Sequence, residues 1–211
     1  DIMNEETLSS GFFGEDITLD IYTDLKEFYT PANGFSRLHL CRRYGKLHIL
    51  KSLQPFYSSQ EFYKQLLLKE FNIGYQLDHP NIRHTLGWEK NDLLGNYIVL
   101  EYIDGIPLTT FIEQGKLTQA LAYKFITEIC NALQYIHSKQ LIHKDLKPNN
   151  ILITHNGNNV KLIDFGLADC DDYEILKIPA GTEKYLAPEQ LNPNATLDCR
   201  TDIYSLGIII E

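Results

Sequence analysis

Three side chains that suit phosphoryl transfer occur in two short segments of this sequence. Asp145 and Asn150 lie in the string His-Lys-Asp-Leu-Lys-Pro-Asn-Asn at 143–150, and Asp164 begins the string Asp-Phe-Gly at 164–166. An aspartate can accept a proton from an attacking hydroxyl, while an amide oxygen and a second carboxylate can hold Mg²⁺ on a nucleoside triphosphate. Each string alone is weak, but the two rarely occur by chance in this order and at this separation.

A lysine and a glutamate upstream could complete a site of this kind. Lys51 ends a strand-like apolar run, and Glu70 lies in an amphipathic helical pattern that closes with His-Pro-Asn-Ile at 79–82. Two later strings complete the set of motifs: Gly-Thr-Glu-Lys-Tyr-Leu-Ala-Pro-Glu at 181–189 and Asp-Ile-Tyr-Ser-Leu-Gly at 202–207.

Together these motifs resemble those of eukaryotic-type protein kinases of the serine/threonine branch, over roughly residues 25–211. The resemblance implies an α+β, bilobal, protein-kinase-like fold. A small antiparallel β-sheet lobe would carry one large helix, and the large lobe would be mainly α-helical. The implied activity is transfer of the γ-phosphoryl group of Mg-ATP to a serine or threonine hydroxyl of a protein substrate, so ATP and Mg²⁺ are the expected cofactors.

The resemblance also implies a role for each catalytic residue. Asp145 would orient the acceptor hydroxyl and take its proton, while Lys147 would reach the γ-phosphate and bridge to Thr182. Lys51 would hold the α- and β-phosphates, and Glu70 would fix the lysine side chain. A solvated surface pair is the competing interpretation of Lys51 and Glu70.

The metal ligands and the adenine-binding residues follow from the same resemblance. Asn150 and Asp164 would bind Mg²⁺, and His143 would pack against Phe165 instead of taking part in acid–base chemistry. The remaining histidines show no metal-ligand spacing. Leu100 would be the gatekeeper beside adenine. The implied ATP-binding residues are Phe28, Gly34, Ser36, Ile49, Lys51, Glu70, Leu100, Glu101, Ile103 and Leu152, with Glu101 and Ile103 acting through their backbones.

The phosphate-covering loop at 29–36 departs from the family pattern. Of its three glycines only the third, Gly34, is present, and Pro31 has a fixed φ and no N–H to offer. Ser36 stands where a valine usually covers adenine. Ile49 stands where an alanine is usual, so its larger side chain should crowd the purine. These changes predict weaker ATP binding more than altered chemistry.

Two further departures concern the catalytic loop and the glutamate-bearing helix. Lys144 replaces an arginine, which keeps the charge but loses the bidentate grip on a phosphorylated segment. Gly74 replaces a large apolar side chain that would touch Phe165, and glycine costs a helix about 1 kcal/mol relative to alanine. We therefore expect the active position of this helix to be weakly held.

The segment 164–189 would be the activation segment, and it contains no serine or threonine between Gly166 and Thr182. Tyr173 is a candidate phosphorylation site. One hypothesis is that acidic side chains of this segment replace a phosphate group near Lys144; the alternative is a solvated acidic loop. The acidic residues are Asp169, Asp171, Asp172 and Glu174.

Bulk composition narrows the class of protein. The chain has 211 residues, 44% of them hydrophobic and 22% charged, as in ordinary globular proteins, and its net charge of −9 argues against non-specific nucleic-acid binding. No signal peptide and no apolar run near the roughly 20 residues of a membrane helix is visible. We expect a cytoplasmic protein without a membrane or nucleic-acid partner; its oligomeric state is not indicated. The cysteines show no Cys-x-x-Cys pairing and are expected to be free thiols: Cys41, Cys130, Cys170 and Cys199.

The chain divides into three parts by pattern. We expect an N-terminal extension at 1–18, a small lobe at 19–103 and a large lobe at 104–211 that is incomplete at its C-terminus. The sequence would then be a fragment, without the usual arginine partner of Glu189. A broad apolar face would be exposed if the natural protein ended at Glu211.

Local patterns predict the elements that position the site. Three strands in a meander are expected from about 19 to 53, with turns at Asn33-Gly34 and Tyr44-Gly45. A helix is expected at 58–77, then strands at 82–89 and 97–102, with a hinge at Asp104-Gly105. In the large lobe, Thr118 would cap a helix with apolar residues Phe125, Ile129, Leu133 and Ile136, followed by short strands at 151–153 and 160–163.

Two other functions compete with a protein kinase. A pseudokinase, or a nucleotide-binding scaffold with weak or no catalysis, is favoured by Pro31, Ser36, Ile49 and Gly74, but the retained catalytic residues argue against it. A small-molecule kinase of similar fold is disfavoured by the Gly-Thr and Ala-Pro-Glu strings.

Overall fold

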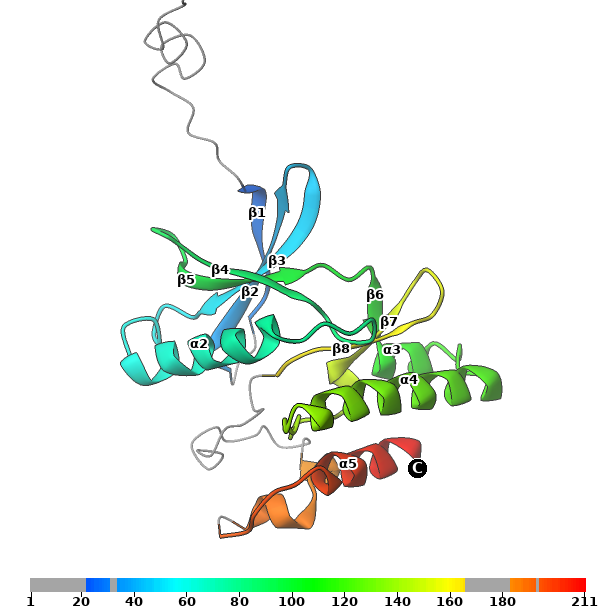
Figure 1. The fold of residues 1–211 in the computed structure, drawn as a ribbon. Coiled ribbons are helices and arrows are strands. Elements are labelled where there is room, and N and C mark those ends of the chain that lie inside the picture. The colour runs from blue at the N-terminus through cyan, green and yellow to red at the C-terminus, as the bar shows by residue number, and fades with distance from the viewer. Residues whose placement is uncertain (1–21, 31–33, 166–182, 193) are drawn as a thin grey trace, which may run out of the picture.

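The computed structural model of this chain describes residues 22–30, 34–165, 183–192 and 194–211. Figure 1 shows two parts. The small lobe holds strands β1 to β5 and helix α2, and the large lobe holds helices α3 to α5 and strands β6 to β8. The predicted bilobal α+β architecture is confirmed. The extension predicted at 1–18 lies outside the described residues.

The small lobe is built on a five-stranded antiparallel sheet in the order β1-β2-β3-β5-β4. The tight turn between β2 and β3 is at Tyr44-Gly45, as predicted, with φ values of 51° and 79° that suit a two-residue hairpin. The strands are β1 (Tyr22–Tyr29), β2 (Ser36–Arg43), β3 (Lys46–Leu53), β4 (Thr85–Asn91) and β5 (Gly95–Glu101).

The start of β4 differs from the prediction of a strand from Ile82. Ile82 forms a parallel bridge with Leu162 of the large lobe, and the Arg83 N–H donates to the Leu162 carbonyl at 3.0 Å. These two residues therefore pair with the other lobe, and β4 begins only at Thr85.

Helix α2 (Glu61–Tyr75) buries Leu67, Glu70 and Gly74, which lie on one face at helical spacing. A Cβ on Gly74 would overlap the Thr85 side chain of β4. The glycine therefore permits close approach of helix and strand. Thr85 occupies the space beside Gly74. The weak hold on the active position of α2, which was expected from the missing side chain against Phe165, stays a prediction.

The large lobe contains α3 (Leu108–Glu113), α4 (Gln119–Ser138) and α5 (Arg200–Ile210). The hydroxyl of Thr118 accepts a hydrogen bond from the Leu121 N–H, so the predicted cap of α4 is confirmed. A small sheet in the order β6-β7-β8 lies beside these helices. Its strands are β6 (Gly105–Pro107), β7 (Ile151–Thr154) and β8 (Val160–Leu162), and single 3₁₀ turns cover Pro148–Asn150, Glu183–Tyr185 and Pro188–Leu191.

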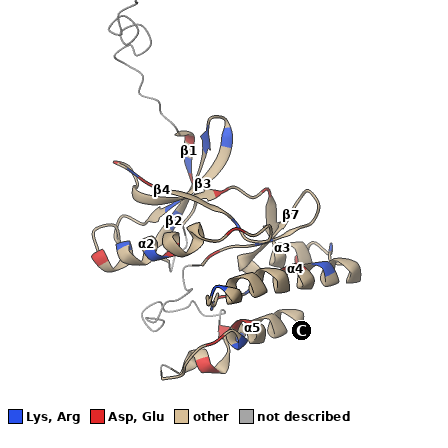
Figure 2. Cartoon of the chain, in the orientation of Figure 1, with Lys and Arg blue, Asp and Glu red and all other residues tan. Residues whose placement is uncertain are grey.

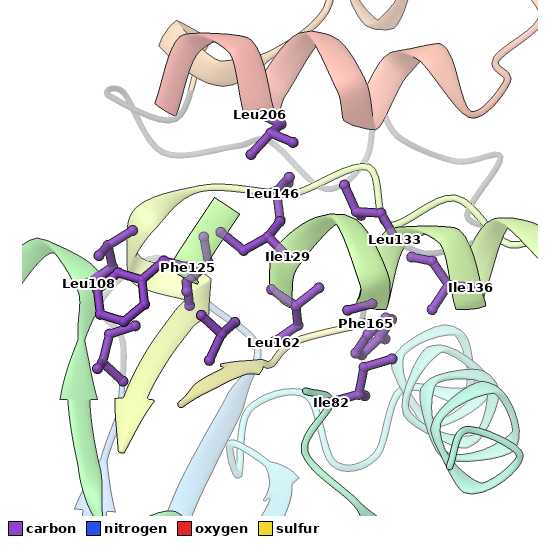
Figure 3. Packing of buried hydrophobic residues seen from close by; sticks show 14 of the residues in the cluster. Ile82, Leu108, Phe125, Ile129, Leu133, Ile136, Leu146, Leu162, Phe165 and Leu206 are labelled. Atoms are coloured by element: carbon purple, nitrogen blue, oxygen red, sulfur yellow. The ribbon is translucent and has the colours of Figure 1, made fainter. Parts of the chain in front are cut away.

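The core of the large lobe supports the predicted catalytic segments. Figure 3 shows Leu206 of α5 extending toward Leu146, and Ile82 lying beside Phe165. The residues predicted to form the apolar face of α4 are all buried in this core: Phe125, Ile129, Leu133 and Ile136. Burial of side chains of this size contributes about 1.5–3 kcal/mol each, so the loop that contains Leu146 is held by the same apolar packing as the helices.

Charged residues of both signs are interspersed over the described ribbon of both lobes, as Figure 2 shows. No helix in the described ranges has both the length and the apolar character needed to cross a lipid bilayer.

We predict that Gly74→Ala destabilises the protein although alanine favours a helix by about 1 kcal/mol. Overlap with Thr85 should outweigh that gain, for a net loss of about 1–2 kcal/mol in the free energy of unfolding. In a Thr85→Ala background the loss should shrink, because the overlapping hydroxyl is gone. Urea unfolding of the four proteins measures the coupling; equal losses in both backgrounds would contradict the prediction.

Candidate active site

The loop that contains Asp145 is held by the buried carboxylate of Asp202 on α5. Asp202 accepts hydrogen bonds from the backbone N–H groups of His143 (2.9 Å) and Lys144 (3.0 Å), and its Oδ2 lies 2.7 Å from His137 Nε2. Asp202 is completely buried. A buried carboxylate is stable only when its oxygens are fully hydrogen-bonded, so Asp202 ties this loop to α4 and α5.

Lys144 adopts a left-handed backbone conformation, with φ of 68°. This conformation is costly for a residue with a side chain and persists where neighbours fix it. Its N–H is fixed by Asp202, and its carbonyl accepts a hydrogen bond of 2.8 Å from the Gln190 side chain. Gln190 in turn accepts from the Ala187 N–H, so the segment after 183 helps to aim Asp145.

Asp145 is surrounded by groups that set the position and charge of its carboxylate. Asn150 Nδ2 donates to its Oδ2 at 3.0 Å and to its carbonyl at 2.8 Å, and Lys147 Nζ lies 3.6 Å from its Oδ1. Burial and the nearby Asp164 carboxylate raise the pKa of Asp145, and Lys147, His143 and Asn150 only partly oppose this shift. A carboxylate with a raised pKa is a better proton acceptor.

His143 has the structural environment that the sequence predicted. Its ring lies 4.9 Å from the ring of Phe165, measured between centroids. His143 Nδ1 accepts from the Asp145 N–H at 3.2 Å, which leaves the proton on Nε2 to donate to the Ile163 carbonyl at 3.1 Å. Both ring nitrogens of His143 are therefore hydrogen-bonded, one to the Asp145 backbone and one to the backbone just before Asp164.

Asn150 and Asp164 come from segments that are hydrogen-bonded to one another. The Ile163 N–H donates to the Asn150 carbonyl at 3.0 Å, and Asp164 follows with a left-handed φ of 64°. Because Asn150 Nδ2 is committed to Asp145, its amide oxygen is the atom able to meet a cation. An amide oxygen and carboxylate oxygens are hard donors that suit Mg²⁺, so these residues fit the predicted ion.

Lys51 of β3 and Glu70 of α2 form a buried ion pair, with 2.6 Å between Nζ and Oε1. The competing interpretation as a solvated surface pair is wrong. Lys51 Nζ also lies 3.8 Å from Asp164 Oδ1. Burial alone would lower the pKa of Lys51, but the two carboxylates outweigh it and hold that pKa above its ordinary value. Lys51 thus keeps its charge and points it at the predicted metal ligand.

Arg83 is a charged residue at this site that sequence reasoning missed. Its backbone pairs with Leu162, two residues before Asp164, and the carboxylates of Asp164, Glu70 and Glu101 all favour its charge. Burial nevertheless lowers the pKa of the guanidinium. The only sequence signal was a cation placed directly after the apolar end of the His-Pro-Asn-Ile string.

The residues predicted to surround adenine come from both lobes. Ile49 and Leu100 are directly paired across β3 and β5 and are buried in one apolar cluster. Leu152 lies on β7 opposite Pro107 of β6, and Phe28, near the end of β1, is 56% exposed. Crowding of the purine by Ile49 stays a prediction.

The hinge residue Glu101 is fixed by the neighbouring strand. Its N–H donates to the His84 carbonyl at 3.0 Å, and its carboxylate accepts from the His84 N–H at 2.9 Å. Although burial works against it, these bonds and nearby Lys161 hold the pKa of Glu101 below its usual value. The backbone N–H of Glu101 is therefore already bonded within the small lobe, and the contact of the Glu101 backbone with adenine stays a prediction. Ile103 follows in the connection to β6.

Gly34 and Ser36 lie at the entry to β2, and Ser36 pairs with Leu53 of β3. Thr182, Tyr173 and the four acidic residues of the activation segment lie outside the described residues, so their roles stay predictions.

Glu189, whose usual arginine partner was expected to lie outside this sequence, accepts a hydrogen bond of 2.8 Å from the Thr201 hydroxyl at the start of α5. The Ser205 hydroxyl donates to the Tyr185 carbonyl at 2.6 Å. Helix α5 thus holds the described part of the Ala-Pro-Glu segment through two side chains.

Comparison with known proteins gives one family. The family model described as protein kinase domain matches residues 34–211. A probable serine/threonine-protein kinase of Clostridium perfringens is 34% identical over 174 residues, which are 81% of this chain and 25% of that protein.

Two further relatives are the serine/threonine-protein kinase ppk25 of Schizosaccharomyces pombe and the calcium-dependent protein kinase 5 of Plasmodium falciparum. The first is 34% identical over a match that covers 79% of this chain and 39% of that kinase. The second is 40% identical over a match that covers 68% of this chain and 26% of that kinase. The chain therefore spans well under half the length of these relatives.

We predict that Asp145→Asn stabilises the protein without Mg²⁺ or nucleotide. A raised pKa means that the ionised carboxylate is less favourable in the folded than in the unfolded chain, so above the unfolded pKa of about 3.9 its charge lowers the free energy of unfolding. The variant should have a higher urea midpoint at pH 7, and the difference should shrink as the pH falls toward 4.

The matched control is Asp92→Asn, which removes a carboxylate from the exposed turn between β4 and β5 and should leave the midpoint unchanged. A lower midpoint for Asp145→Asn at pH 7 would show that this carboxylate stabilises the fold and would refute the prediction.

Proposed function

Because this chain belongs to the protein kinase family, we propose that it transfers the γ-phosphoryl group of ATP to a serine or threonine hydroxyl of a protein substrate. One observation carries the proposal: Lys51, Glu70 and Asp164 form one charged group, while Asn150, joined by backbone hydrogen bonding to the Asp164 segment, contacts Asp145. A proton acceptor, two oxygen ligands and a buried cation are thereby gathered at the junction of the lobes.

In the proposed mechanism the side chains position groups and neutralise charge. Asp145 orients the acceptor hydroxyl and takes its proton as the hydroxyl oxygen bonds to the γ-phosphorus. The bond from the γ-phosphorus to the β,γ-bridging oxygen breaks in the same step, and ADP leaves with that electron pair. Lys51 holds the α- and β-phosphates, and Lys147 stabilises negative charge on the γ-phosphoryl group. Mg²⁺, held by Asn150 and Asp164, would neutralise phosphate charge when bound.

The preference for serine and threonine rests on the combination of Lys147 with the Gly-Thr string that contains Thr182. We also propose a lobe boundary near residue 103 and a cytoplasmic location. The cysteine pattern, which has no Cys-x-x-Cys pairing, supports the location. Among the described residues, Cys41, Cys130 and Cys199 are free thiols.

We predict that Asp145→Ala lowers phosphoryl transfer to a generic protein substrate about 10²–10⁴-fold, because the proton acceptor is lost. The measurement is Mg²⁺-dependent incorporation of labelled γ-phosphate with full-length protein. Asp92→Ala is the matched control and should behave as the unaltered protein does. Equal incorporation by the unaltered protein and Asp145→Ala would remove the catalytic proposal.

We predict that Mg·ATP at 100 times its Kd raises the free energy of unfolding by about 2.7 kcal/mol, because the ligand binds only the folded state. Lys51→Met should lose most of this gain, since its cation faces the phosphates. Stabilisation by Mg·ATP without any transfer would favour a nucleotide-binding scaffold instead, and no stabilisation at all would contradict nucleotide binding.

A further inference from the structure

The phosphate-covering loop has lost the residues that usually shape it, yet the part next to β2 is firmly held. Tyr29 and Pro31 occupy the first two glycine positions, and only Gly34 remains. A loop of this kind binds phosphate through backbone N–H groups, so some feature must fix the direction of its peptide units.

Gln54, the residue directly after β3, supplies three hydrogen bonds to this part of the loop. Its backbone N–H donates to the Phe35 carbonyl at 2.8 Å. Its side-chain Nε2 donates to the carbonyls of Gly34 at 2.8 Å and Ser36 at 3.1 Å. Three consecutive carbonyls are thus bound by one residue, and both hydrogens of its amide nitrogen have an acceptor.

These bonds also fix the direction of the neighbouring N–H groups. In a trans peptide the carbonyl and the N–H of the next residue point in opposite directions. Because the Gly34 carbonyl points at Gln54, the Phe35 N–H points away from it. The Gln54 side chain therefore sets the orientation of these peptide units, which glycines would leave free to rotate.

Gln54 is itself held on the side of α2. Its carbonyl accepts from the Tyr57 N–H at 2.9 Å. The Tyr57 ring packs on Phe35 and on Tyr63 of α2, with centroids 6.5 Å and 4.6 Å apart, and the Phe35 and Tyr63 rings are 5.3 Å apart. Such aromatic pairs contribute beyond the area they bury. In Figure 1 the connection from β3 leads directly into α2, the helix that carries Glu70.

We propose that Gln54 is a positioning residue for nucleotide binding, which orients the backbone at 34–36 toward the triphosphate in place of the missing glycines. The inference rests on the proposed function, because it assumes that a nucleoside triphosphate binds beneath this loop. Gln54 acts on the phosphates through the backbone. Ser36, the residue of this stretch predicted to lie beside adenine, is also held by its pairing with Leu53 of β3, so its position does not depend on Gln54 alone.

The test compares the binding of Mg·ATP and of adenosine to full-length protein by calorimetry. Gln54→Met keeps the length of the side chain but removes both donors. Its Kd for Mg·ATP should rise about tenfold, the size expected for lost hydrogen bonds, while its Kd for adenosine stays unchanged. Gln65→Met is the matched control, because Gln65 is exposed on α2 and its amide donates to Glu61 of the same helix. This variant should bind both ligands as the unaltered protein does.

Each other outcome overturns a stated part of the argument. Equal Kd values for Mg·ATP in Gln54→Met and the unaltered protein would refute the role of Gln54 and leave the proposed function standing. An equal rise in the Kd values for Mg·ATP and adenosine would also refute the role of Gln54, because that result would show general damage to the packing of the site. An unaltered protein that binds neither ligand would overturn the proposed function, and this inference with it.

A second variant keeps the test decisive if Gln54→Met does not fold. Tyr63→Leu removes the ring that packs on Phe35 and Tyr57 but leaves the amide of Gln54 intact. It should weaken Mg·ATP binding by a smaller factor than Gln54→Met, again with adenosine binding unchanged. Unchanged Mg·ATP binding in Tyr63→Leu would show that the packing of Tyr63 on Phe35 and Tyr57 does not affect the backbone at 34–36. That result would refute the proposed support of this backbone from α2.

Discussion

The buried ion pair between Lys51 and Glu70 is the interaction on which the arrangement of the small lobe depends. Two charges removed from water are stable only if each compensates the other, so β3 and α2 must keep the register that brings Nζ to 2.6 Å from Oε1. An ion pair of this kind is a constraint on geometry more than a source of stability. Loss of Lys51 would leave Glu70 buried without its ion-pair partner, which commonly costs about 3–5 kcal/mol. Loss of Glu70 would leave Lys51 beside the more exposed Asp164 carboxylate, 3.8 Å away. The position of α2 therefore determines the direction in which the Lys51 charge points.

The large lobe meets the same demand for compensation through a different arrangement. Asp202 is buried, and its hydrogen-bonding partners among the described residues include no lysine or arginine side chain. Backbone N–H groups supply two of its hydrogen bonds. The strained backbone of Lys144 is the result, and it is stabilised because Gln190 holds its other side. The catalytic loop thus depends on a carboxylate and an amide that come from segments more than 40 residues later in the chain.

Local signals in the sequence were enough for most of the fold and for the pairing at the centre of the site. The Thr118 cap, the Tyr44-Gly45 turn and the helix of Glu70 are encoded by neighbouring residues, and the motif spacing correctly paired Lys51 with Glu70. What the sequence could not show depends on contacts between distant segments. The Gly74 position is filled by Thr85 from another element, and β4 starts late because Ile82 pairs with Leu162. Arg83 and Gln54 carry no motif, so only their neighbours in space reveal what they do.

The bridge between Ile82 and Leu162 also bears on how the lobes can move. The Leu162 N–H donates to the Asn81 carbonyl at 2.7 Å, and the Arg83 N–H donates to the Leu162 carbonyl, so the chain just after α2 is stitched to the large lobe. A rigid helix anchored near its C-terminal end can pivot there while its N-terminal end travels furthest. Rotation of α2 about this anchor would then move the aromatic rings at its N-terminal end further than it moves Glu70. The packing of these rings therefore reports a change in helix position more strongly than the ion pair does.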